Sequence, residues 1–279
     1  MKKNILKKGL SYLNRIYSVW IESILFKNWF NPLMTLYINF RSFPIKQAFK
    51  LPVFVYGWPH FFSLYGKMEC VGMCKTGMIT LNRTLYGAPS HPGLNTAMNN
   101  WGKIIFHGPC LIHTGNKINT SREGILELGA NTKIMHYVNI TAHIHVFIGA
   151  NTWITHRCQI LDSNFHYIAN LSRKTVSRYS KPIHIGNSCW ICNSSTIAAG
   201  SIIQDNTIVA SNSLVNKDFS NIPPESIIGG IPAKFIASGF RRINNSKLEA
   251  EIIKFFEEHP NDNVFVLNDE FKHEYCDAY

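Results

Sequence analysis

The 279-residue chain has few charged side chains, and no apolar run in it is long enough to cross a membrane. Charged residues make up 16% of the chain, whereas 46% of residues are hydrophobic and 13% aromatic. This composition excludes general disorder, because disordered chains are rich in charge and poor in aromatic residues. A bilayer span needs about 20 apolar residues, and no secretory signal is evident. We therefore expect a folded cytoplasmic protein of one large domain or two modest ones.

Acidic residues are scarce and unevenly distributed. The chain has 28 Lys and Arg against 17 Asp and Glu, which gives a net charge of +11. Residues 1–50 hold nine basic side chains and one acidic; residues 51–236 hold fourteen and seven; residues 237–279 hold five and nine. A basic surface favours nucleic acid, an anionic membrane or a phosphorylated ligand. The distribution predicts a basic segment over 1–50, a main domain over 51–236 and an acidic segment over 237–279.

The cysteines are odd in number, seven in all, and spread through the chain. This excludes a disulfide framework and indicates a reducing compartment. Cys189 and Cys192 form a lone CxxC without a second pair at zinc-site spacing. We interpret Cys189 as a small buried residue of the repeat described below, not as a metal ligand.

The N-terminal segment is apolar and aromatic over residues 10–40 but is interrupted by charges and by Asn31-Pro32. Near-helical spacing of apolar residues predicts an amphipathic helix; these residues are Leu10, Leu13, Ile16, Tyr17 and Trp20. With lysines in front, residues 1–50 fit a helix that lies on anionic lipid. A helical cap packed on the body or on a neighbouring subunit fits equally well.

A six-residue repeat organises the main domain. An aliphatic residue recurs at every sixth position, at Ile185, Ile191, Ile197, Ile203, Val209 and Val215. A small residue follows four positions after each of the first five, at Cys189, Ser195, Ser201, Thr207 and Ser213. Neither a helix nor a simple strand has this period. Six residues suit a short strand and a turn, and three such units would close a triangular coil of about 18 residues with the repeated side chains inside.

The same spacing occurs upstream in three blocks that are offset from one another. They consist of Phe106, Ile112 and Ile118; of Leu128, Ile134, Ile140 and Val146; and of Ile148, Ile154 and Ile160. The step from Ile160 to Ile185 is not a multiple of six, which predicts a loop insertion over 161–184.

This repeat resembles that of the hexapeptide-repeat acyltransferases over about residues 104–220, with irregular strands expected before it. The resemblance implies an all-β solenoid, a left-handed parallel β-helix, which is an exception to the usual right-handed crossover rule. We expect an N-terminal helical segment and a C-terminal helix at its ends. The family also implies acetyl-CoA as acyl donor and a homotrimer with its active sites between subunits.

The segment from Ile160 to His166 is similar to the one that bears the catalytic histidine in the maltose/galactoside and capsular-polysaccharide O-acetyltransferases. The resemblance assigns His166 as the general base. A hydroxyl is a poor nucleophile at neutral pH, and a neutral imidazole can take its proton. Asp162 or Asn164 would orient the ring by hydrogen bonding or contact the sugar.

Residues 185–192 are similar to the family motif I-G-x-x-x-W-I-G, with Cys192 in place of the last glycine. In the family, the tryptophan of this motif flanks the coenzyme channel, which assigns Trp190 to the coenzyme. The alternative for Trp190 is packing against a neighbouring element. Because a cysteine side chain is larger than that of glycine, Cys192 affects how closely a ligand can approach this turn.

Two further segments, residues 215–218 and 228–234, resemble the family ending V-x-K-D…G-x-P-A-K. The resemblance assigns Lys217 and Lys234 to the coenzyme phosphates. It also assigns Ser211 to the pantetheine arm, which the backbone there would follow. The family often has an arginine three residues after the final lysine; here Ala237 occupies that position, and Arg241 and Arg242 follow.

The insertion carries four basic residues, Arg173, Lys174, Arg178 and Lys181. They form either a solvated loop or a basic rim over an acidic sugar or a lipid-linked diphosphate.

The C-terminal segment has an amphipathic helical pattern. We expect a helix capped by Ser246 and running to about His259, with Glu249 and Glu251 in its first turn. Leu248, Ile252, Phe255 and Phe256 would share one face.

The function we expect is O-acetyl transfer from acetyl-CoA to a carbohydrate hydroxyl, on a surface polysaccharide or its lipid-linked precursor, in the cytoplasm or at the inner face of the membrane. The repeat argues against nucleic acid as a partner. Three alternatives stay open: a γ-carbonic-anhydrase-like hydratase, a non-catalytic scaffold or membrane adaptor, and N-acetylation of an amino-sugar nucleotide. The histidines relevant to a hydratase metal site are His136, His143, His145 and His156.

Overall fold

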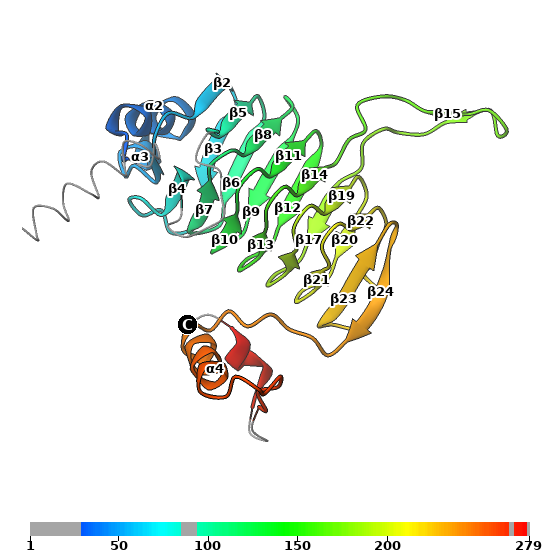
Figure 1. The fold of residues 1–279 in the computed structure, drawn as a ribbon. Coiled ribbons are helices and arrows are strands. Elements are labelled where there is room, and N and C mark those ends of the chain that lie inside the picture. Colours follow the sequence, from blue (N-terminus) through cyan, green and yellow to red (C-terminus); the bar gives the residue numbers. More distant parts are fainter. Residues whose placement is uncertain (1–28, 85–93, 268–270, 278–279) are drawn as a thin grey trace, which may run out of the picture.

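A computed structural model describes residues 29–84, 94–267 and 271–277, and most of them form a stack of short parallel strands (Figure 1). The strands make three long sheets, which we call B, C and D. In spatial order, sheet B contains β1 (Val53–Val55), β4 (Ile79–Arg83), β7 (Cys110–His113), β10 (Thr132–Ile134), β13 (Trp153–Ile154), β18 (Trp190–Ile191), β21 (Ile208–Val209), β23 (Ser226–Gly230) and β24 (Ala233–Ser238).

Sheet C contains β2 (His60–Leu64), β5 (Ala97–Asn100), β8 (Lys117–Thr120), β11 (Asn139–Ala142), β14 (Gln159–Leu161), β19 (Thr196–Ala198) and β22 (Leu214–Val215). Sheet D contains β3 (Lys67–Cys70), β6 (Lys103–Phe106), β9 (Ile125–Leu128), β12 (His145–Ile148), β17 (Ile183–Ile185) and β20 (Ile202–Ile203). The chain passes from B to C to D and begins the next coil, which is the all-β solenoid expected, a left-handed parallel β-helix.

The six-residue repeat forms the core of this β-helix. Every repeated apolar residue from Phe106 to Val215 is buried, and these residues come from all three sheets. The small residues four positions later are buried as well. The Ser195 hydroxyl donates to the Ala210 carbonyl at 2.9 Å, and the Ser201 hydroxyl donates to the Val215 carbonyl at 2.9 Å. Small side chains therefore fit the corners and also bond to the next coil, as the repeat predicts.

One residue at each B–C corner turns the chain with a left-handed backbone. Arg157, Ser194 and Asn212 have φ angles of 60°, 61° and 57°. Each lies three residues after a buried aliphatic residue and directly before the small buried one. This single left-handed residue, which costs roughly 1–2 kcal/mol except in Gly, Asn or Asp, redirects the chain from one sheet to the next.

The β-helix begins earlier than the repeat indicates. The strands before about residue 104 belong to the same β-helix, within the main domain expected over 51–236, and the irregularity expected of them occurs as register shifts between Phe61 and Ser63 and between Leu81 and Arg83. β1 to β6 pair in parallel within the same three sheets; for example, Val53 pairs with Ile79, and Met68 with Ile104. Longer corners, such as residues 71–78, break the six-residue spacing here, while the strands keep their pairing.

The insertion leaves the solenoid after β14 and returns at β17. It carries a short antiparallel hairpin, β15 (Ala169–Asn170) and β16 (Thr175–Val176), which projects well away from the body (Figure 1). An antiparallel bridge between Ser163 and Ser180 closes its base.

Helices flank the solenoid. α2 (Pro32–Ser42) and α3 (Ile45–Ala48) lie at the N-terminal end, while α4 (Ser246–Glu258) and the short helix η1 (His273–Cys276) belong to the C-terminal segment (Figure 1). The amphipathic helix expected around Leu10–Trp20 lies outside the described residues. Within those residues, no helix has the length and apolar character needed to span a membrane.

The N-cap of α4 differs from our expectation. Asn245, not Ser246, is the cap, because its backbone is extended and its side-chain oxygen accepts from the N–H groups of Lys247 and Leu248 at 3.0 and 3.3 Å. Ser246 is the first helical residue, and Glu249 lies in the first turn whereas Glu251 does not.

Candidate active site

His166 lies in the insertion, a few residues beyond the corner between sheets C and D. Its side chain is exposed, as is that of Asn164. The backbone holds the segment in place, because the Asn164 N–H donates to the Tyr179 carbonyl at 2.9 Å. The Phe165 N–H donates to the Ser163 hydroxyl at 3.0 Å, and Phe165 has a left-handed backbone. The His166 side chain is thus exposed to solvent, while the backbone just before it is held by hydrogen bonds.

Asp162 is fully buried at that base. Its carboxylate accepts from the backbone N–H groups of His143, Ile144 and His145 at 2.6, 2.7 and 2.9 Å. These three donors belong to the same corner of the preceding coil. The Asp162 side chain therefore joins two coils and anchors the insertion, while its expected role in orienting the ring of His166 stays a prediction.

A second group of candidates lies at the corner between sheets B and C. Ser211 is exposed in the turn between β21 and β22. Two residues on, the Ser213 hydroxyl accepts from the Gly230 N–H at 3.1 Å and donates to the Ala210 carbonyl at 2.6 Å. This bond ties the β23–β24 turn, which leads to the exposed Lys234, to the turn that carries Ser211.

Gly229 permits this contact. A Cβ atom at Gly229 would lie 2.8 Å from the Cβ atom of Ala210 and 3.3 Å from the Ser213 hydroxyl. A side chain there would push the turn away from the corner. The glycine of the G-G-I-P-A-K segment is thus required by packing against the preceding coil.

The candidates are therefore divided between two corners. Lys217 follows β22 and His166 follows β14, so both lie at the C–D side, with β19 between the two strands. Neighbouring strands are about 4.8 Å apart, which separates β14 from β22 by roughly 10 Å. We call Asp162, Asn164, His166 and Lys217 the histidine corner, and Ser211 with Lys234 the serine corner. β22 separates the two.

Trp190 lies on the outer face of sheet B, paired in register with Trp153. The Arg242 guanidinium carbon is 3.3 Å from the centroid of the Trp153 ring and 5.2 Å from that of Trp190. Burial lowers the pKa of Arg242 to about 10. The C-terminal segment thus covers this tryptophan pair through a cation–π contact, which favours the packing interpretation of Trp190.

Arg241 is also engaged within the chain. Its guanidinium bonds to Glu225 at 3.1 Å and to Asp277 at 2.7 Å. Neither arginine that follows Ala237 is therefore presented to a coenzyme phosphate in the way the exposed Lys217 and Lys234 are.

The four histidines of the hydratase alternative do not converge. The His143 ring contacts the Tyr179 hydroxyl at 3.0 Å, and the His145 ring contacts Glu127 at 2.9 Å. His136 and His156 lie instead at the B–C corner. Across the part of the chain that the structure describes, no group of three His, Cys, Asp or Glu side chains is placed to hold a metal ion.

Sequence reasoning missed a stack of three histidines at this corner. The ring centroids of His113 and His136 are 4.7 Å apart, and those of His136 and His156 are 5.3 Å apart. Burial is the main cause that lowers the pKa values of His113 and His136, each to about 4. The signal for part of the stack was in the repeat, because His136 and His156 each follow a repeated isoleucine by two residues.

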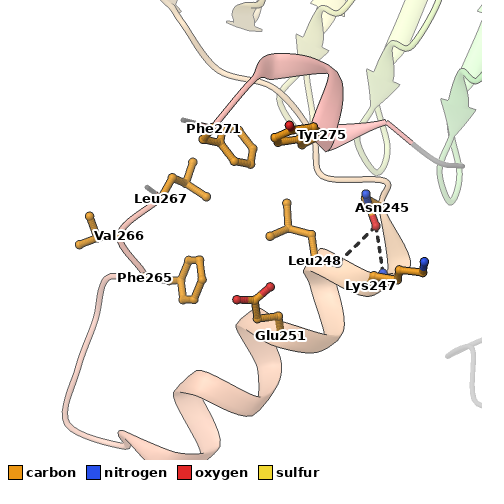
Figure 2. A pocket seen from close by; sticks show the side chains of 9 residues that line it. All are labelled: Asn245, Lys247, Leu248, Glu251, Phe265, Val266, Leu267, Phe271 and Tyr275. Carbon is orange, nitrogen blue, oxygen red and sulfur yellow. Dashed lines mark hydrogen bonds between the residues drawn. The ribbon is translucent and has the colours of Figure 1, made fainter. Parts of the chain in front are cut away.

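A separate hollow of about 400 Å³ lies within the C-terminal segment. Figure 2 shows Leu248, Phe265, Phe271 and Tyr275 around it, with Glu251 and Lys247 at its edge. None of the candidate catalytic or coenzyme residues lines it. This hollow is therefore separate from the histidine corner and the serine corner.

Residues 182–217 match the model of the bacterial transferase hexapeptide (six repeats). The chain is 27% identical over 147 residues to the lipopolysaccharide biosynthesis O-acetyl transferase WbbJ of Escherichia coli K12, covering 50% of this chain and 74% of that protein. A galactoside O-acetyltransferase of the same organism is 32% identical over 120 residues, covering 43% of this chain and 55% of that enzyme.

Among solved structures, the polySia-specific acetyltransferase NeuO aligns over 76% of this chain and 84% of its own, with 17% identity and a TM-score of 0.41. In its coils and in these sequence matches, the chain resembles the class of hexapeptide-repeat acyltransferases. The particular proteins that it resembles over about half of its length are O-acetyltransferases.

Proposed function

We propose that the protein transfers the acetyl group of acetyl-CoA to a hydroxyl of a carbohydrate, on a surface polysaccharide or its lipid-linked precursor. One observation carries the proposal: the exposed His166 follows the buried, hydrogen-bonded Asp162 in a long insertion between the hexapeptide coils, in a chain whose curated relatives are O-acetyltransferases. The free cysteines of the described residues fit the reducing cytoplasm, where we place the reaction.

The reaction needs one proton to move twice. The neutral imidazole of His166 takes the proton of the acceptor hydroxyl while the oxygen attacks the thioester carbonyl. The tetrahedral oxyanion collapses and expels the coenzyme as a thiolate, which recovers the proton from the imidazolium. The products are an acetyl ester and the free thiol, with no acyl-enzyme. A general base of this kind contributes about 10²–10⁴ in rate.

The remaining candidate residues would bind and position the coenzyme and the sugar. Lys217 and Lys234 are exposed cations that suit the coenzyme phosphates, and the turn at Ser211 would follow the pantetheine arm. Asn164, next to His166, would contact the sugar or the ring. Trp190, which the C-terminal segment covers, would reach the coenzyme only if that segment moves.

The division between two corners supports a site shared by subunits. Within one chain, β22 separates His166 and Lys217 from Ser211 and Lys234. In a homotrimer, the histidine corner of one subunit can face the serine corner of the next. We propose this arrangement, in which a monomer has no complete site.

The acceptor is expected to carry negative charge. Arg173, Lys174 and Arg178 are exposed on the insertion that carries His166. They suit an acidic sugar or a lipid-linked diphosphate.

The test is acetyl-CoA turnover by the full chain against sugars, sugar nucleotides, amino-sugar nucleotides and lipid-linked oligosaccharides. We expect a carbohydrate hydroxyl to stimulate thiol release, and His166→Ala to lower turnover by about 10²-fold or more. The control is His107→Ala. His107 pairs with Glu127 and follows β6, in an earlier coil than His166. If no acceptor stimulates cleavage, the proposal fails; transfer only to an amine would indicate the N-acetyl alternative. Stoichiometric zinc with hydratase activity, or biological function unchanged by His166→Ala, would indicate the hydratase or the scaffold.

A further inference from the structure

The first helix of the described chain has its polar face inside and its apolar face outside. The buried residues of α2 are Thr35, Ile38, Asn39 and Ser42. Exposed on the other side are Leu33, Leu36, Tyr37 and Phe40, with 68%, 46%, 52% and 43% of their surface in solvent. A surface helix of a globular protein normally has the opposite arrangement.

The inner face is polar because it covers the open end of the β-helix. Among the described residues, β1 is the edge strand of sheet B, and no earlier strand of the sheet pairs with its backbone groups. The Asn39 side chain accepts from the Val53 N–H at 3.1 Å and donates to the Val53 carbonyl at 2.7 Å. The Thr35 hydroxyl accepts from the Val55 N–H at 3.0 Å. Side-chain amides and hydroxyls thus replace a missing strand, and the apolar residues of α2 are left to face outward.

The outward face continues into neighbouring elements. The Phe40 ring packs edge-on against Phe49, with centroids 5.2 Å apart, and Phe49 is 73% exposed. On the other side, the Tyr37 ring lies 6.3 Å from that of Phe61. We call Leu33, Leu36, Tyr37, Phe40 and Phe49 the cap face. It lies at the end of the solenoid opposite β23 and β24 (Figure 1).

The stretch of chain that forms the cap face carries charge of one sign. No Asp or Glu occurs between Glu22 and Glu69, whereas this stretch contains Lys27, Arg41, Lys46, Lys50 and Lys67. Lys46 and Lys50 are exposed beside Phe49, and the Arg41 guanidinium lies over the Tyr65 ring at 5.3 Å. Besides Lys27, residues 1–28 add five more basic side chains against one acidic.

We propose that the cap face docks on an anionic lipid surface. Exposed leucines and phenylalanines would enter the headgroup region, Tyr37 suits the interface, and the lysines would pair with lipid phosphates. A second copy of the cap would instead bring like charges together, which disfavours a symmetric contact at this face. Docking here leaves the histidine corner free, so the proposal is independent of the acyl-transfer reaction.

The experiment is co-sedimentation of the full chain with vesicles of phosphatidylcholine alone and of phosphatidylcholine mixed with phosphatidylglycerol. We expect binding only to the anionic vesicles, weakened by added salt. The double variant Leu36→Glu/Phe40→Glu should lower vesicle affinity by about tenfold or more, and Lys46→Glu/Lys50→Glu likewise. Val264→Glu/Val266→Glu is the matched control, because these valines are 67% and 82% exposed in the C-terminal segment.

Circular dichroism and thermal unfolding of each variant verify that it folds. Equal binding to both vesicle types, no binding by the wild type, or unchanged binding of Leu36→Glu/Phe40→Glu would each overturn the proposal. A change in the oligomer's mass with that variant, without any vesicle binding, would identify a second copy as the occupant and would likewise overturn it.

Discussion

One carboxylate oxygen of Asp162 accepts the backbone N–H of Ile144 at 2.7 Å, which joins the base of the insertion to the coil before it. The N–H groups of His143 and His145 bond to the same side chain. The backbone N–H groups of three consecutive residues, 143–145, thus share one buried carboxylate. The insertion that carries His166 is anchored here, although residues 164–178 of the insertion are exposed.

We predict that Asp162→Ala destabilises the fold by about 3 kcal/mol or more, because it leaves three donors without an acceptor in a buried place. Asp162→Asn keeps one acceptor oxygen and should cost less. Thermal unfolding with the exposed Asn164→Ala as control measures the difference. If Asp162→Ala melts within a degree or so of the wild type, the anchoring role is wrong.

We predict that Ser213→Ala weakens coenzyme binding because it frees the turn at Gly230 from the serine corner. KM for acetyl-CoA should rise by roughly fivefold, and the free energy of unfolding should fall by about 1 kcal/mol. Ser201→Ala is the matched control, since its hydroxyl makes two comparable bonds, to Ala198 and Val215, away from that turn. Equal KM values for the two variants would contradict the role of the Gly230 contact.

The histidine stack predicts loss of stability in acid. His113 and His136 have pKa values lowered to about 4 in the folded protein, against about 6.5 in an unfolded chain. The unfolded state therefore binds more protons below pH 6.5. The two histidines therefore make their full contribution to the free energy of unfolding above about pH 6.5. This contribution falls as the pH drops toward 4, by at most about 1.4 kcal/mol per pH unit for each histidine.

Urea unfolding at a series of pH values between 7 and about 4.5 measures this slope. His136→Asn should make it shallower, whereas His60→Asn, at an exposed position, should leave it unchanged. A slope that is the same in wild type and His136→Asn would show that this histidine does not titrate as proposed.

The two corners predict complementation between inactive subunits. His166→Ala removes the base, and Ser211→Trp would block the serine corner. If each site combines the histidine corner of one subunit with the serine corner of the next, refolding equal amounts of the two variants together should restore about one quarter of the wild-type activity, since random mixing leaves that share of interfaces intact. Activity that stays at the level of the separate variants would mean that each site lies within one chain.

Much of the fold was predictable from local pattern. The spacing of Ile185, Ile191 and Ile197 determines which side chains enter the core, because a coil of short strands repeats the same environment every six residues. The small residues at Cys189 and Ser195 mark the corners for the same reason. The six-residue spacing does not mark the earlier coils around Val53 and Met68, because longer corners break the period there, although strand pairing needs no fixed corner length.

Local sequence pattern was enough to specify the solenoid, the class of enzyme that the chain resembles and the residue types that acyl transfer needs. The use of these residues depends on how the coils and end segments pack together. It buried Asp162 under three backbone donors, covered Trp190 with Arg242, and separated His166 from Ser211 by a strand. It also turned the polar face of α2 inward, because the unpaired edge of β1 required hydrogen-bonding partners. These outcomes depend on contacts between distant segments, which no local spacing records.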